Sequence, residues 1–170
     1  MYHKFRSNIV RNGDLLAWRN DGSILGNAIS YWTKGIYTHV GMVWTLHNRA
    51  YVLDAYFKGG VRLRYLGDNL PVDIIRTNIK WSKELEDDAL SRLGRSYNYI
   101  GAAMLGFDIT PNYDSEVCSL YAASILAKGG IKIPRDKSIT LTPQKLVDKV
   151  CELTGSEIKT IHSMKGLKYD

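Results

Sequence analysis

The stretch from Tyr37 to Arg76 constrains the fold most, because its residues alternate as they do in strands. From residue 37 to 46, His39 and Gly41 fall on one side of an extended chain, and Val40 and Met42 on the other. Three more runs of this kind follow, at residues 50–57, 61–65 and 72–76. Only short, turn-forming linkers separate the four runs, so the sequence predicts an antiparallel meander.

Helix-like segments flank this stretch on both sides. They cover residues 24–34, 82–93, 118–129 and 142–155, each opened by serine or threonine near its start and closed by a glycine near its end. A buried strand is expected before them, within residues 12–19, and residues 131–134 are expected to form a loop or an edge strand. The helix after Ser23 is expected to pack its apolar side, which includes Ile24 and Trp32, on the core.

These segments predict one α+β domain over residues 1–170, in which an antiparallel β-sheet packs against helices. The length suits a single hydrophobic core, and the sequence shows no internal repeat or linker.

Cys118 is the first candidate functional residue. It precedes an apolar run that ends at Gly129, and Ser115 or Asp114 is the expected N-cap, which places Cys118 in the first turn of a helix. The positive end of the helix dipole favours a thiolate there. The structural alternative is a small buried cysteine with no chemical role, which is how we interpret Cys151 in the last helix.

A thiolate needs a base or an imidazolium beside it to act as a nucleophile. His39 is the candidate, with a purely structural histidine as the alternative. His47 cannot share the same site, because eight residues of strand span about 27 Å at about 3.4 Å per residue. Asp54 is a carboxylate within an apolar run, and it either faces solvent or holds the far nitrogen of His39.

The composition is that of a globular protein, 45% hydrophobic and 24% charged, with a net charge of +6. The basic residues form no run, so a solvated surface is the first explanation of the charge, and contact with an anionic polymer or membrane surface is the second. No nucleic-acid motif is visible, and nucleic acid is not an expected partner. With no signal-peptide run and no apolar stretch of membrane-spanning length, we expect a cytoplasmic protein by default.

The order of these motifs resembles the permuted papain-like hydrolases, the YiiX/YebB-like branch of the NlpC-type cysteine peptidase superfamily. The motifs are Gly13-Asp14-Leu15-Leu16, His39-Val40-Gly41, Leu53-Asp54-Ala55 and Cys118-Ser119, with Gly94 to Tyr99 and Thr142-Pro143 as further matches over residues 12–150. In the ordinary NlpC-type order the cysteine helix comes first, whereas here it comes last, as in a circular permutation.

This resemblance implies a papain-like core in which the sheet carries the histidine and the packed helix carries the cysteine. It implies Cys118 as nucleophile, His39 as general base and acid, and Asp54 as the residue that orients His39, where this branch commonly has a glutamate. The backbone N–H of Cys118 is expected to contribute to an oxyanion hole. Tyr97, Tyr99 and Ser119 are the candidate substrate-binding residues, with packing as the alternative for the tyrosines. No metal site and no cofactor are expected.

The expected function is therefore a cysteine peptidase or amidase that cleaves an amide or peptide bond, such as one in a cell-wall peptide, through an acyl-enzyme. A lipid ester hydrolase or acyltransferase related to lecithin:retinol acyltransferase is the alternative. That branch usually has a second histidine as its third residue and an asparagine before the cysteine, where this chain has Asp54 and Val117. A catalytically inactive binding module is the third possibility. The oligomeric state is left open.

Overall fold

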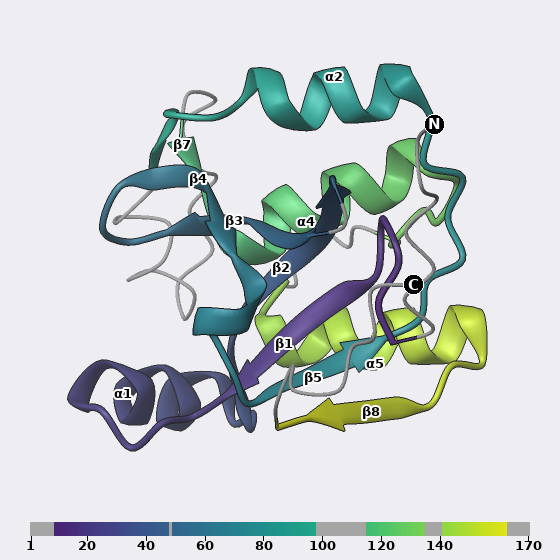
Figure 1. The fold of residues 1–170 in the computed structure, drawn as a ribbon. Helices are drawn as coiled ribbons and strands as arrows, with labels where there is room; N and C mark the ends of the chain where they lie inside the picture. Colours follow the sequence, from purple (N-terminus) through teal and green to yellow (C-terminus); the bar gives the residue numbers. More distant parts are fainter. Residues whose placement is uncertain (1–8, 48, 98–114, 135–140, 163–170) are drawn as a thin grey trace.

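A six-stranded antiparallel sheet forms the centre of the computed structural model, which describes residues 9–47, 49–97, 115–134 and 141–162 (Figure 1). The strand order is β4–β3–β2–β1–β5–β8, and every neighbouring pair is antiparallel. The strands are β1 (Leu15–Arg19), β2 (Tyr37–Leu46), β3 (Arg49–Tyr56), β4 (Gly60–Tyr65), β5 (Val72–Ile75) and β8 (Ile158–Ile161). A separate parallel pair joins β6 (Ser96–Tyr97) to β7 (Ser115–Glu116).

The sheet confirms the antiparallel α+β class, but one predicted pairing is wrong. β2, β3 and β4 form the expected meander, whereas β5 does not continue it and pairs instead with β1. All four residues of β5 are buried, which suits a position between β1 and β8 rather than an outer place beside β4. β8 lies in the C-terminal part, where no element was expected, and residues 131–134 form a loop.

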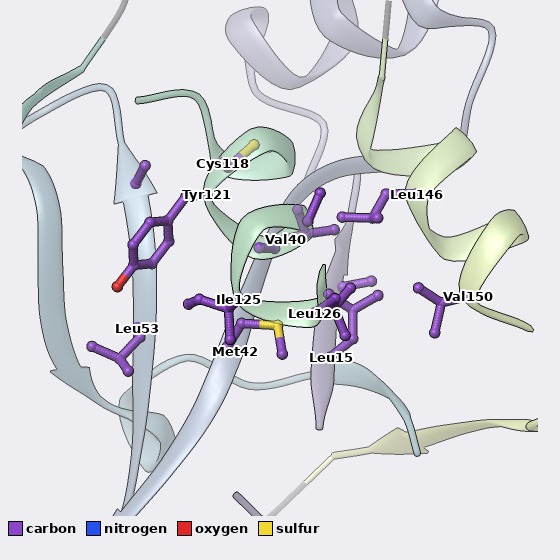
Figure 2. Packing of buried hydrophobic residues seen from close by; sticks show 14 of the residues in the cluster. Leu15, Val40, Met42, Leu53, Cys118, Tyr121, Ile125, Leu126, Leu146 and Val150 are labelled. Carbon is purple, nitrogen blue, oxygen red and sulfur yellow. The ribbon is translucent and has the colours of Figure 1, made fainter. Parts of the chain in front are cut away.

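Two helices cover one face of the sheet and hold the main core together. α4 (Cys118–Lys128) packs on β2 and β3, and α5 (Pro143–Thr154) packs on β1, β2 and β5. Figure 2 shows Tyr121, Ile125 and Leu126 of α4 beside Met42 and Leu53 of the sheet. On β2, Val40 and Met42 face this core while Val43 faces a smaller core on the opposite side, as the alternation predicted.

The helix ends mostly follow the sequence signals. Ser23 caps α1 (Ile24–Thr33), Ser82 caps α2 (Lys83–Ser91) and Thr142 caps α5, each by accepting a backbone N–H with its side-chain oxygen. Gly155 ends α5 in the left-handed conformation. Among the described residues no helix is both long and apolar enough to cross a bilayer.

The expectation that α1 packs its apolar side on the core is wrong for Ile24 and Trp32, which face solvent, whereas Ile29 is partly buried. Ile24 is 92% exposed, Tyr31 79% and Trp32 66%. α1 projects from the sheet where β1 ends, away from α4 and α5 (Figure 1). The helical period correctly predicted a helix here, but the period alone does not determine which side of the helix is buried against the protein.

The packing of α4 on the sheet yields a stability prediction. Leu126 is fully buried, so Leu126→Ala removes apolar contacts and leaves a cavity, and it is expected to lower the free energy of unfolding by about 2–5 kcal/mol. Urea denaturation measures the change. Leu153→Ala is the matched control, since Leu153 is 51% exposed and its loss is expected to cost much less. Equal losses in both variants would contradict the described docking of α4.

Candidate active site

Three predicted residues meet where α4 begins beside the sheet. His39 lies near the start of β2, Asp54 lies near the end of β3, and Cys118 is the first residue of α4. The pairing of β1 with β2 shifts register here: Trp18 pairs with His39 and Arg19 with Tyr37, which leaves Thr38 unpaired in this ladder. Such a bulge bends a strand locally and redirects its side chains. The irregularity therefore falls directly beside the histidine.

The start of α4 differs from the predicted capping. Val117 is the N-cap, with no side-chain hydrogen bond, because residues 115–116 stay extended and pair with β6. The expectation of a Ser115 cap is therefore wrong, and Asp114 lies outside the described residues. The first backbone bond of the helix runs from Tyr121 N–H to the Val117 carbonyl. The N–H groups of residues 118–120 thus have no partner within the helix and add positive potential around Cys118.

His39 bridges the other two residues. Its Nε2 lies 2.7 Å from Oδ2 of Asp54, which leaves Nδ1 as the ring nitrogen available to the Cys118 side chain. Burial lowers the pKa of His39, but hydrogen bonds to Asp54 and Cys118 and the charges of both groups outweigh burial and raise this pKa to about 9. A pKa of about 9 places the imidazole in its protonated form at neutral pH, in which both ring nitrogens carry an N–H.

Two arginines hold the buried carboxylate from the other side. Arg62 Nε donates to Asp54 Oδ1 at 3.0 Å, and Arg64 Nε donates to Oδ2 at 2.8 Å. Burial raises the pKa of Asp54, but the hydrogen bond and charge of His39 and the charges of both arginines lower it to about 2. Asp54 is fully buried, so it does not face solvent as the alternative reading allowed. Asp54 is therefore ionised at neutral pH, and its carboxylate holds the His39 imidazole in place.

Aromatic rings confine the imidazole on two sides. The Trp18 ring centroid lies 5.3 Å from that of His39, and the Tyr56 ring meets His39 edge-on at 5.4 Å. Arg62 stacks over Tyr56 at 3.8 Å, and Arg64 lies over Trp18 at 5.0 Å. The space that Gly41 provides is filled: a Cβ there would lie 2.8 Å from Val52 Cγ1 and 3.1 Å from Asp54 Cβ. Gly41 therefore allows the close approach of β3 that brings Asp54 to His39.

Cys118 and His39 open onto a pocket with a volume of about 1110 Å³. Its wall is largely apolar, and it extends from Val117 at the start of α4 past Trp18 to Ala28, Ile29 and Trp32 on α1. Cys118 itself is 4% exposed. Any molecule that reaches the sulfur must therefore enter through this pocket.

The predicted substrate-binding residues have different positions. Tyr97 lies on β6 and lines the pocket. Ser119 does not: it is fully buried, and its hydroxyl donates to the Leu141 carbonyl at 2.6 Å, so it serves to hold α4. Tyr99 lies outside the described residues. Cys151 is a partly buried packing residue, as expected.

Asp14, from the glycine-aspartate-leucine motif, has a structural position away from the pocket. It is buried and accepts hydrogen bonds from Arg76 Nη1 and from the backbone N–H of Arg11, both at 2.7 Å. Burial raises the pKa of Asp14 to about 6 against the opposing effects of both arginines. Its role is to fix the start of β1 against the chain that follows β5.

Arg62 and Arg64 are the site residues that sequence reasoning missed. Arg62 pairs directly with Asp54 across β3 and β4, and Arg64 lies two residues further on the same side. Two arginines at this spacing in an edge strand of the meander were a usable signal, because a buried carboxylate requires cationic or hydrogen-bonding partners. To infer these contacts one must also know the register of β3 and β4, which cannot be derived from the sequence pattern alone.

The fold has a known counterpart among solved structures. The crystal structure of "metalloprotein yiiX" from Escherichia coli O157:H7 superposes with a TM-score of 0.55 and 22% sequence identity, covering 92% of this chain and 91% of that one. This likeness shows a shared fold. No family model matches the chain. No curated protein sequence matches it significantly.

The name of this structural neighbour raises the question of a metal. Within the described ranges, no three or more His, Cys, Asp and Glu side chains lie together in a way that could hold a metal ion. We therefore assign no metal to Cys118 and His39, and the expected absence of a metal site stays a prediction.

The His39–Asp54 contact yields a titration prediction. In the wild type, NMR of the His39 imidazole is expected to give a midpoint near pH 9. Asp54→Asn removes the hydrogen-bonding carboxylate and its charge, while burial still lowers the pKa of His39 and Cys118 still raises it, so the midpoint is expected to fall clearly below that of the wild type.

Asp14→Asn is the control, because it removes another buried aspartate that pairs with an arginine but does not contact His39. It is expected to leave the midpoint unchanged. A midpoint that stays near pH 9 in Asp54→Asn would show that Asp54 does not set the charge of His39.

Proposed function

We propose that the protein is a cysteine hydrolase that acts through an acyl-enzyme on Cys118. The observation that carries the proposal is the chain of contacts from the Cys118 side chain through the His39 imidazole to Asp54 Oδ2, at the uncapped start of a helix. A cysteine paired with a histidine, itself held by a third group, is the arrangement that activates a thiol nucleophile. The papain-like interpretation of the sheet and α4 belongs to the same proposal.

In the first half of the reaction, the Cys118 thiolate attacks a substrate carbonyl carbon and forms a C–S bond. The carbonyl electrons move to oxygen, and the N–H groups of the first turn of α4, including that of Cys118, stabilise the oxyanion. His39 then gives its Nδ1 proton to the leaving nitrogen or oxygen as that bond breaks. Asp54 keeps the imidazole oriented and stabilises its positive charge before the transfer.

In the second half, water attacks the thioester carbonyl and the neutral His39 accepts a proton from the water. The C–S bond breaks, the acid product leaves, and the thiolate–imidazolium pair is restored. Each proton that His39 donates in the first half is thus replaced in the second.

The first candidate for the scissile bond is an amide or a peptide bond, which rests on the resemblance in the sequence motifs. A second candidate is the ester or amide of an apolar acyl group. The pocket favours this second class, because its wall near Cys118 is formed largely by side chains such as Trp18, Val117 and Ile29. The His39 proton serves either leaving group, so the chemistry at Cys118 is common to both candidates.

Activity tests the proposal directly. Peptide p-nitroanilides and a chain-length series of p-nitrophenyl acyl esters provide chromogenic probes of both candidates, and intact-mass spectrometry detects the acyl-enzyme. Cys118→Ala is expected to lower turnover at least about a thousandfold and to abolish the acyl adduct, because it removes the nucleophile. Cys151→Ala is the matched control and is expected to retain activity.

A chelator separates this mechanism from a metal-dependent one. EDTA treatment is expected to leave turnover unchanged, because no step is assigned to a metal. Loss of activity on chelation, with Cys118→Ala still active, would overturn the proposed chemistry. A rate that rises with acyl length would select the second substrate class, and p-nitroanilide cleavage without that rise would select the first.

A further inference from the structure

Helix α1 presents several of its apolar side chains to solvent. Residues at positions i, i+4, i+7 and i+8 form an exposed stripe, consisting of Ile24, Ala28, Tyr31 and Trp32. The side toward the protein includes Ile29, Ser30 and Thr33, which are partly buried. The Ser30 hydroxyl is buried and has no hydrogen-bond partner among the described residues. An apolar stripe on the solvent side of a helix marks a surface that contacts something else.

The stripe has the composition of a membrane-interface segment. No residue from Ile24 to Thr33 carries a charge, whereas exposed helices usually carry several. Tyr31 and Trp32 lie together with ring centroids 6.0 Å apart, and such amphipathic rings collect at the level of lipid headgroups. Ile36, which is 54% exposed, extends the apolar surface just beyond the helix, and the exposed Lys34 lies between them.

The size of the stripe argues against a folded protein as the occupant. A ten-residue helix is about 15 Å long and about 10 Å wide, so its face covers roughly 150 Å². Stable interfaces between proteins bury roughly 800 Å² on each partner. A bilayer needs no such area, because a few inserted apolar side chains combine with electrostatic attraction to anionic lipids. The net charge of +6 supplies that attraction.

The position of the stripe at the pocket supports the same occupant. Ala28 and Trp32 belong both to the exposed stripe and to the wall of the pocket that reaches Cys118. Whatever covers α1 therefore lies at the entrance to this pocket. A bilayer at this place presents single amphiphilic molecules whose apolar parts can enter without crossing water, whereas a rigid partner would close the entrance.

We propose that the exposed face of α1, formed by Ile24, Ala28, Tyr31 and Trp32, docks the protein on the surface of an anionic phospholipid bilayer. The helix lies in the interface with its stripe toward the acyl chains, and the pocket opens toward the lipid. Docking depends on the stripe and on overall charge, and it does not depend on chemistry at Cys118.

Co-sedimentation with vesicles tests this docking. The wild type is expected to bind vesicles of phosphatidylcholine with phosphatidylglycerol more tightly than vesicles of phosphatidylcholine alone. The double variant Ile24→Ser/Trp32→Ser is expected to bind at least about tenfold more weakly, because it removes two of the inserted side chains. Leu46→Ser/Leu153→Ser is the matched control, since it changes two exposed leucines outside α1 and is expected to bind like the wild type.

Three further measurements make the outcomes decisive. Circular dichroism establishes that both double variants are folded, and brominated lipids are expected to quench wild-type tryptophan fluorescence more than that of Trp32→Phe. Cys118→Ala is expected to bind vesicles like the wild type, so docking and the hydrolase proposal can fail separately. The proposal would be overturned if the wild type did not bind vesicles, or if both double variants bound them equally well. It would also be overturned if the α1 substitutions abolished self-association of the protein but left vesicle binding unchanged.

Discussion

The carboxylate of Asp54 is fully buried and charged, and the geometry of the site depends on how its charge is balanced. One imidazole and two guanidinium groups surround it, from β2 and β4 on either side of its own strand. A buried charge without such partners is strongly unfavourable, so these contacts fix the register of three strands as well as the orientation of His39. Asp54 and Cys118 together raise the pKa of His39 to about 9, and His39 with the two arginines lowers the pKa of Asp54 to about 2.

The main core determines where the sulfur lies relative to this charged set. Tyr121, Ile125 and Leu126 hold α4 on β2 and β3, and the Ser119–Leu141 hydrogen bond ties its first turn to the chain before α5. Cys118 therefore approaches His39 from a helix fixed by packing, and Val117 provides no side-chain cap for the backbone N–H groups of the first turn. Polar contacts orient the imidazole, and apolar packing positions the nucleophile.

Much of this arrangement could be predicted from local sequence. The bounds of β2, the placement of Cys118 at a helix start, and the caps at Ser82 and Thr142 follow from periodicity and end signals. The pairing of β5 with β1 could not be predicted, because short linkers favour neighbouring strands and no local pattern encodes the alternative. The exposed stripe of α1 was not predicted, because periodicity shows which residues share one face of a helix but not whether that face is buried or exposed. Val117 replaced Ser115 as cap because pairing of β7 with β6 keeps the preceding residues extended.

The most direct test of the central claim is the rate of iodoacetamide alkylation at Cys118 as a function of pH, followed by mass spectrometry in the wild type and in His39→Ala. Cys151 serves as an internal reference in both proteins. The account predicts that Cys118 is alkylated much faster than Cys151 at neutral pH in the wild type, and that His39→Ala removes this difference. Alkylation of Cys118 that follows Cys151 at every pH in both proteins would contradict a functional cysteine–histidine pair.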